Sequence, residues 1–461
     1  MTRTRRRIAT AGAAVAALTA LAGCGGGDEG GENAITVWTT DSLPDRMAQA
    51  RAIGEDFTAE TGIEVEFVGV AEDQFAQLLT SAAAAGDLPD VIGSISLAQV
   101  RTLSSNDLVD TAATGEVIDA LGEETFVETA LELTRDGDDQ LAVPSESWAQ
   151  LLYYRTDLFD AAGLEPPETY EDIRAAAEAL DGPDMAGFVG ATAAGDTFTQ
   201  QTFEHIALGN DCEMVDDSGE IAIASDQCVE AFDFYGDLVQ NYSTAGAQDV
   251  DTVRASYFAG QAAMAIWSTY LLDELAGLRA DAMPTCPECA DNPAFLAENT
   301  GVVPAIQGPS GEDPAQFGAI TSWAITANSE TDASKQFVEY MLSDGYVPWL
   351  AIAPEGKVPV RQGTPEEPMQ YAEAWTTLDI GVDTKAPLAD VYAEDVVEAL
   401  QAGPTELDLW GIGEGHGDLV GAALGELPVA AAVSEVASGV DPREAAERAA
   451  AALRNIQDSL Q

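Results

Sequence analysis

Histidine and lysine are scarce in this chain of 461 residues. It contains 2 His and 19 Lys+Arg against 80 Asp+Glu, which gives a formal net charge of −61 at pH 7. Nucleic-acid binding needs clusters of Lys and Arg that neutralise phosphates, so the composition argues against a nucleic-acid partner, and we expect none. The scarcity of histidine also argues against His-rich metal sites and most His-based acid–base catalysis. We therefore expect no metal ion and no cofactor.

Sequence motifs of common enzymes are also missing. The chain has no G-x-S-x-G, no G-x-x-x-x-G-K-[ST] and no H-E-x-x-H. The Gly-rich segment GIGEGHG (411–417) follows no predicted strand, so we interpret it as a loop. Pairs of carboxylates, as in glycosidases, stay open because 80 acidic residues make chance pairs abundant. We predict that the protein is not an enzyme; an extracellular carbohydrate-active enzyme is the alternative.

Hydrophobic residues are plentiful, at 46% of the chain, so it can bury real cores. At roughly 150 residues per domain, the length predicts about two or three domains. An acidic, Lys-poor surface repels other copies of the same chain and stays hydrated, as suits salty surroundings. We expect a monomer.

The N-terminus has the pattern of a bacterial lipoprotein signal peptide. An Arg cluster at 3–7 precedes an apolar run at 8–21, which is too short for a membrane span of about 20 residues. The run ends in Leu-Ala-Gly-Cys, similar to a lipobox, so Cys24 is the predicted lipidation site after removal of residues 1–23. The alternative is an ordinary signal peptide. A flexible tether at 24–33 would then hold the body at the extracellular face of the cell membrane.

Four cysteines remain after Cys24, an even number that suggests disulfides in an exported protein. Proximity in the sequence favours Cys212–Cys228 and Cys286–Cys289, one of three possible connectivities. The Cys286-Pro-Glu-Cys289 segment could instead supply half of a zinc site or a thioredoxin-like redox site. The absence of a nearby His argues against zinc, and the absence of a βαβ pattern argues against the redox site.

Strands and helices alternate in the first part of the chain. Predicted strands at 35–38, 63–68 and 90–92 are separated by predicted helices at 45–60 and 75–85, a pattern typical of a parallel α/β sheet. The later pattern is mainly helical, with predicted helices at 169–180, 227–241, 253–259, 332–343 and much of 390–461. No stretch after the signal peptide has 18 uninterrupted apolar residues.

Seven segments in order carry a family resemblance. They are ITVW (35–38), FTAETGIEVEF (57–67), AAGDLPDVI (84–92), LAVPSESWAQLLYYRTDLFDAAGLEPPETYEDI (141–173), YFAGQAAMAIWSTY (257–270), FGAITSWAITANSETDASKQFVEYM (317–341) and GKVPVR (356–361). Together they resemble the extracellular solute-binding proteins of ABC importers, in the carbohydrate-binding group (family 1) that includes maltose-binding protein. The chain departs from that pattern at Arg155 (usually Asn), Tyr170 and Tyr270 (usually Trp) and Ser268 (usually Gly).

The resemblance implies an α/β fold with two lobes, of the type II periplasmic-binding-protein kind. We expect hinge crossings near 141–147, 302–307 and 352–362. The expected N-terminal lobe comprises 34–143 and 307–355, and the expected C-terminal lobe comprises 144–303 and 362–461. The resemblance further implies capture of an oligosaccharide or glycoside in a cleft between the lobes, closure by a hinge, and delivery to the permease subunits of an ABC transporter.

A sugar needs flat aromatic rings against its C–H faces and paired polar groups around its hydroxyl rim. The expected ligand-binding residues leave strands or lie near crossings, and they are Thr40, Asp41, Ser94, Glu146, Trp148, Trp267, Tyr270, Trp323 and Arg361. Thr40 and Asp41 could instead cap the following helix. The aromatic residues could be core residues, and Arg361 could pair with acidic residues.

A polyamine is the main alternative ligand, because Asp41 and Glu146 would suit a cation and aromatic rings accept cations on their faces. Other small solutes carried by related two-lobe proteins, and a partnership with a sensor kinase receptor, also stay open.

Overall fold

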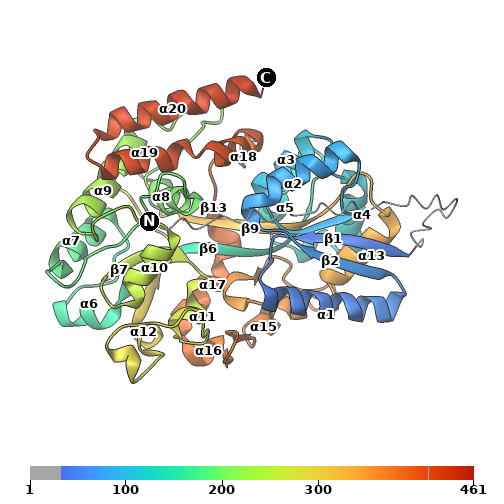
Figure 1. The fold of residues 1–461 in the computed structure, drawn as a ribbon, viewed down its shortest axis with the longest axis horizontal. Helices are drawn as coiled ribbons and strands as arrows, with labels where there is room; N and C mark the ends of the chain where they lie inside the picture. Colours follow the sequence, from blue (N-terminus) through green and yellow to red (C-terminus); the bar gives the residue numbers. More distant parts are fainter. Residues whose placement is uncertain (1–32, 414, 461) are drawn as a thin grey trace, which may run out of the picture.

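The fold is that of a computed structural model, which describes residues 33–413 and 415–460. The predicted signal peptide, Cys24 and the tether up to residue 32 lie outside the described residues. Figure 1 shows two α/β lobes side by side, joined in the middle by long strands. We call the lobe at the right of that view the first lobe and the other the second lobe.

The first lobe begins with alternating strands and helices. In chain order its elements are β1 (Ala34–Thr39), α1 (Pro44–Thr61), β2 (Glu64–Gly69), α2 (Glu72–Ala85), β3 (Val91–Ser96), α3 (Leu97–Ser105), α4 (Thr111–Leu121), η1 (Glu123–Thr125), α5 (Glu128–Leu133), β4 (Arg135–Asp136) and β5 (Asp139–Gln140). Strand β1 pairs in parallel with both β2 and β3. Helix α1 ends at Gly62, whose φ of 77° suits glycine. The predicted α/β alternation is confirmed.

Two long antiparallel strands, β6 (Val143–Arg155) and β9 (Gln316–Ile325), connect the lobes. The first part of β6 pairs with β9 and with β10 (Val358–Pro359). The second part of β6 pairs with β7 (Met264–Ser268) and β8 (Thr300–Val303). One continuous strand therefore contributes to the sheets of both lobes.

The second lobe is largely helical around these strands. Its elements are α6 (Thr156–Ala162), α7 (Tyr170–Leu180), α8 (Thr197–Leu208), α9 (Asp226–Asn241), α10 (Val250–Phe258), α11 (Leu271–Leu275), η2 (Glu288–Ala290) and α12 (Phe295–Glu298). Stacked ring pairs such as Phe203 with Phe232, at 4.1 Å between centroids, fill its core. The structure joins Cys212 to Cys228 and Cys286 to Cys289 as disulfides.

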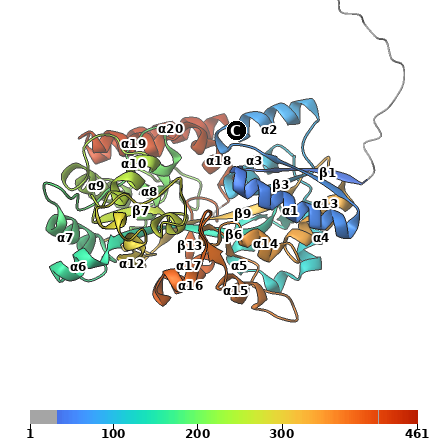
Figure 2. The same ribbon diagram turned by 60° about the horizontal axis from the view of Figure 1, so that its bottom comes forward.

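After β9 the chain returns to the first lobe and then passes below both lobes. The elements are α13 (Thr331–Met341), α14 (Tyr346–Leu350), η3 (Pro354–Gly356), β10, α15 (Gln370–Trp375), β11 (Asp379–Ile380), β12 (Ala386–Pro387), α16 (Leu388–Val391) and α17 (Glu394–Glu406). Figure 2 shows α15, α16 and α17 along the lower edge of the molecule. Helix α17 packs on the connecting strands β6, β9 and β10.

The C-terminal part consists of β13 (Leu407–Asp408), α18 (Gly417–Glu426), α19 (Pro428–Ala437) and α20 (Pro442–Ser459). Strand β13 pairs in parallel with β9. In the predicted loop at 411–417, residues 411–413 and 415 form turns, and Gly417 begins α18. Within residues 33–413 and 415–460, no single helix is long and apolar enough to cross a membrane, although the bent pair α18–α19 meets that test by length and composition.

Candidate ligand-binding site

Lys357 lies at the centre of a charged cluster built from three distant parts of the chain. Its Nζ is 3.0 Å from Asp41 Oδ2 and 3.0 Å from Glu146 Oε1. Asp41 follows β1, Glu146 belongs to β6, and Lys357 lies between η3 and β10. Arg46 in α1 approaches Asp41 from another side, with Nη1 3.0 Å from Oδ1. Two cations thus compensate two buried carboxylates, as buried charge requires.

The local geometry after β1 turns Asp41 toward Lys357. Helix α1 has Leu43 at its N-cap position and Pro44 in its first turn, so neither Thr40 nor Asp41 caps that helix. Thr40 instead donates a hydrogen bond from Oγ1 to the carbonyl oxygen of Ser94, at 2.5 Å. Burial alone would raise the pKa of Asp41, but Lys357 and Arg46 together lower it to about 2. Asp41 is therefore a permanent anion at neutral pH.

Trp349 in α14 closes the cluster from the first lobe. Its indole Nε1 donates to both carboxylate oxygens of Glu146, at 3.1 Å each. The Lys357 ammonium lies 4.2 Å from the centroid of the Trp349 ring. A hydrogen bond, an ion pair and a cation–π contact thus fix Glu146 and Lys357 in one arrangement.

Tyr270 brings the second lobe to this cluster. It follows β7, and its ring lies so close to Gly356 that an added Cβ at that glycine would overlap the ring. The guanidinium carbon of Arg46, from the first lobe, is 5.1 Å from the centroid of the Tyr270 ring. The aromatic ring of one lobe therefore meets the charged groups of the other at the hinge.

A second buried acidic pair adjoins the cluster. Asp273 in α11 and Glu355 in η3 are 2% and 1% exposed. Burial, together with repulsion from Glu355, raises the pKa of Asp273 to about 8. Burial raises the pKa of Glu355 to about 7, against the attraction of Arg46 and Arg279. Both pKa values thus move in the direction that favours the protonated acids.

Comparison with known proteins identifies the family. Residues 40–348 match the family described as bacterial extracellular solute-binding protein. The chain belongs to this family. YcjN of Escherichia coli (strain K12), which carries the name of an ABC transporter periplasmic-binding protein, is 28% identical over 308 residues; that match covers 65% of this chain and 66% of YcjN, just under two thirds of its length.

Solved structures share the fold of this solute-binding protein. The GacH receptor of Streptomyces glaucescens GLA.O, solved unliganded and with acarbose, is 21% identical at a TM-score of 0.66, over 92% of this chain and 98% of that one. Maltose-bound MalE3 of T. maritima is 20% identical at a TM-score of 0.67, over 92% and 99%. A laminaribiose-bound sugar transporter protein of Arthrobacter chlorophenolicus A6 is 20% identical at 0.65, over 92% and 99%. At these identities the likeness confirms the predicted type II fold.

Four predicted ligand residues lie together in the solute-binding protein, namely Thr40, Asp41, Glu146 and Tyr270, with Ser94 attached through its bond to Thr40. Ser94 has a positive φ of 55°. Its buried Oγ has no hydrogen-bond partner among the described residues. A strained residue with an unpaired hydroxyl suits a ligand contact.

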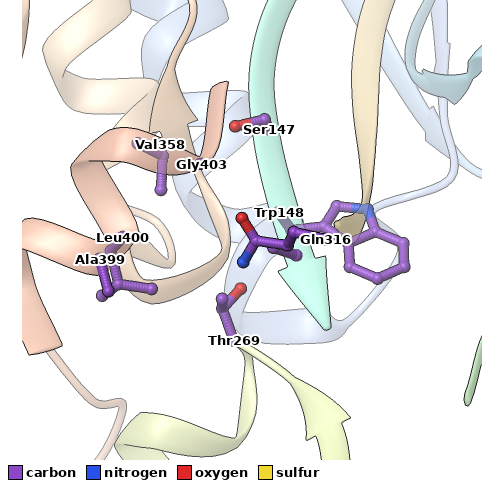
Figure 3. Close-up of a pocket in the computed structure, with 9 residues that line it drawn as sticks. Ser147, Trp148, Thr269, Gln316, Val358, Ala399, Leu400 and Gly403 are labelled. Atoms are coloured by element: carbon purple, nitrogen blue, oxygen red, sulfur yellow. The ribbon is translucent and has the colours of Figure 1, made fainter. Parts of the chain in front are cut away.

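Two other predicted residues lie apart from the charged cluster. The Trp148 ring meets Phe317 edge to face, with 5.9 Å between centroids. Trp148 is among the residues that line a small cavity of about 10 Å³, and Figure 3 shows its indole pointing away from Leu400 and Ala399 on the other side of that cavity. Trp267 donates from Nε1 to the carbonyl oxygen of Val250 at 3.3 Å, which holds it within the second lobe.

Trp323 and Arg361, also predicted as ligand contacts, are buried and engaged with other parts of the protein. Trp323 is 0% exposed and packs edge-on against Phe337 and Trp349, at 5.8 and 5.0 Å between centroids, so it is a core residue of the first lobe. Arg361 is 3% exposed and donates to the carbonyl oxygens of Leu121, at 2.7 Å, and of Leu342. It joins two segments of backbone instead of pairing with acids or facing a ligand.

The two cations that define the cluster, Lys357 and Arg46, were not among the predicted ligand-binding residues. Lys357 lies in the quoted segment GKVPVR and is one of three lysines in the chain. A lysine in a family motif of a chain so poor in lysine was the available signal. Arg46, in the first turn of a helix that the sequence shows as polar and acidic, gave none.

Proposed function

We propose that this solute-binding protein of an ABC importer captures a neutral carbohydrate, an oligosaccharide or glycoside, between its lobes beside Tyr270. The observation that carries the proposal is the internal pairing of Asp41 and Glu146 with Lys357. Because both carboxylates already have a cation, what they can offer a ligand is hydrogen-bond acceptance rather than net negative charge. The Tyr270 ring supplies a flat apolar surface of the kind that sugar C–H faces need.

The polyamine alternative loses its main argument on the same observation. It depended on Asp41 and Glu146 being available to a ligand cation, and Lys357 and Arg46 occupy them. The acarbose, maltose and laminaribiose bound by the structural relatives also support a carbohydrate.

The remaining predictions enter the same proposal. The protein acts by binding, without catalysis, and hands its solute to membrane-embedded permease subunits. It is held as a monomer at the extracellular face of the membrane through a lipid on Cys24. Residues 34–143 with 307–355, and 144–303 with 362–461, are the proposed lobes; α17 and α18 also contact the first lobe, so the last segment is shared.

A thermal-shift screen tests the ligand class. Sugars, oligosaccharides, polyamines and small anions are added separately to the purified protein. A ligand at about 100 times its dissociation constant raises the free energy of unfolding by about 2.7 kcal/mol. We expect shifts with one or more saccharides, recovered unaltered afterwards. Shifts with polyamines alone would contradict the carbohydrate proposal, and a hydrolysed saccharide would contradict the non-enzymatic one.

A further inference from the structure

Helix α18 reaches from the second lobe to the first, while the chain segments before and after it stay packed in the second lobe. Before it, the backbone N–H of Trp410 donates to Glu204 Oε1 at 3.0 Å, and the Trp410 indole donates to the carbonyl oxygen of Cys212 at 2.6 Å. After it, α19 packs on α8 and α9. Between these anchors α18 packs on α3 of the first lobe, and Figures 1 and 2 both show the two helices adjacent across the gap between lobes.

Two glycines make this contact close. A Cβ at Gly421 would lie 3.1 Å from the carbonyl oxygen of Ala98 and 3.1 Å from Thr102 Oγ1. A Cβ at Gly417 would lie 2.5 Å from the Cγ of Arg101. The flank of α18 therefore rests almost directly on the backbone of α3, a separation that larger side chains forbid. Gly425, one turn beyond Gly421, differs: no described heavy atom outside its own helix and neighbours lies within 4 Å of its Cβ position.

The surface under α18 is held rigidly. Arg101 is 7% exposed, and its Nη2 donates to the carbonyl oxygens of Leu133 at 3.2 Å and Arg135 at 2.7 Å. These bonds fix the side-chain stem on which Gly417 rests. At the other end of α18, Leu427 has a φ of 52°, and α18 and α19 meet at a bend of 52°. The bend lets the chain leave the first lobe and return to the second within one residue.

We propose that α18 is a strap that couples the two lobes and sets how readily they separate. A rotation about β6 and β9 carries α3 with one lobe, and carries Trp410, α19 and α20 with the other. The α18–α3 contact must therefore break, or α18 must leave its anchors, whenever the lobes part. This contact lies apart from the Tyr270 cluster, and the proposal does not depend on which solute the protein binds.

The test compares Gly421→Leu with Gly425→Leu in the full chain, without added ligand. Both changes add the same side chain to the same helix, but only the first adds it against α3. Small-angle X-ray scattering reports the radius of gyration, and hydrogen exchange reports the backbone amides of α3. We expect a larger radius for Gly421→Leu and about tenfold faster exchange in α3, with both values unchanged in Gly425→Leu.

If Gly421→Leu does not fold, the milder pair Gly421→Ala and Gly425→Ala replaces it, with exchange in α3 as the readout. Faster exchange in α3 for the 421 variant alone supports the strap. Equal radii and equal exchange in the two folded variants of a pair would overturn it.

Discussion

Lys357 shows how much of the site depends on one side chain. Its side chain is 2% exposed. Its ammonium contacts Glu146, more than 200 residues away along the chain, and Asp41, more than 300 residues away. Its pKa is set by opposing effects, because burial lowers it while Glu146 and Asp41 raise it, and the balance raises it. The lysine therefore stays charged and holds the two acids at the hinge.

Replacing Lys357 with methionine keeps the length of the side chain and removes the charge. Asp41 would keep Arg46, but Glu146 would lose its cation in a buried site, and breaking such a pair costs about 3–5 kcal/mol. We expect a correspondingly lower free energy of unfolding in urea. Lys335→Met is the matched control, since Lys335 pairs with exposed Glu116 and Asp332 and should shift the midpoint far less. Equal effects of the two variants would contradict the account.

Tyr270 is the residue on which the proposed sugar contact depends. Tyr270→Ala removes the ring beside Arg46 and Gly356, and we expect affinity for the saccharide found in the thermal-shift screen to fall about tenfold or more, as for a truncated aromatic anchor. Tyr270→Phe keeps the ring and should retain most of the affinity. Isothermal titration measures both. Unchanged affinity in a folded Tyr270→Ala protein would place the ligand elsewhere.

At the scale of elements, local patterns in the sequence were sufficient for much of the fold. The alternation of β1, α1 and β2 follows from hydrophobic periodicity and from Gly62 at the helix end. Helices α7, α9, α10 and α13 begin and end within a few residues of their predicted limits. The sequence did not reveal the surroundings of side chains whose neighbours come from distant segments. Trp323 packs against residues of α13 and α14, and Arg361 donates a hydrogen bond to the carbonyl oxygen at the end of α4. The local sequence around Trp323 or Arg361 does not indicate these contacts.

Helix α8 carries a buried acid, Glu204, that accepts a hydrogen bond from Trp410 in the segment between β13 and α18. Burial raises the pKa of Glu204 to about 8, although the N–H of Trp410 donates to it. Because the folded pKa exceeds the unfolded one, the native state holds the extra proton, and the contribution of Glu204 to stability is full at low pH and is lost as pH rises toward 8.

Glu204→Gln should remove this pH dependence while keeping an oxygen acceptor for Trp410. We expect the variant to gain in stability relative to the parent as pH rises from about 4.5 to about 8, measured by urea unfolding at several pH values. Glu447→Gln, in an exposed position of α20, is the control and should run parallel to the parent. A constant difference between Glu204→Gln and the parent over this range would show that Glu204 is ionised in the folded protein.

At the scale of the whole molecule, charge is the dominant feature. The net charge of −61 acts against the compact state by self-repulsion, and dissolved salt screens such repulsion over about 10 Å at 0.1 M and about 3 Å at 1 M. The ion pairs around Lys357 are buried and respond little to screening. Repulsion on the surface therefore decides the sign of the salt effect.

We expect the melting temperature to rise between 0.1 M and 1 M sodium chloride, as followed by differential scanning calorimetry. A neutral osmolyte at matched osmolality is the control, because it is excluded from the protein surface but does not screen charge. It should raise the melting temperature less than sodium chloride does. A melting temperature that falls with sodium chloride would mean that exposed ion pairs outweigh the repulsion between acids.

The strand β6 has a consequence for how the protein acquires its shape. Val143 in β6 pairs with Trp323 in β9, and Ser147 pairs with Ile320. Strand β9 therefore leaves the ribosome or the export channel long after β6. Until β9 arrives, one edge of the first part of β6 has no neighbour and the sheet of the first lobe is unfinished, whereas β7 and β8 can already pair with the second part of β6. Such late, non-local pairing slows folding and exposes an edge that could join to other chains. The sheet of the first lobe should therefore be completed late, when β9 inserts between β3 and β6.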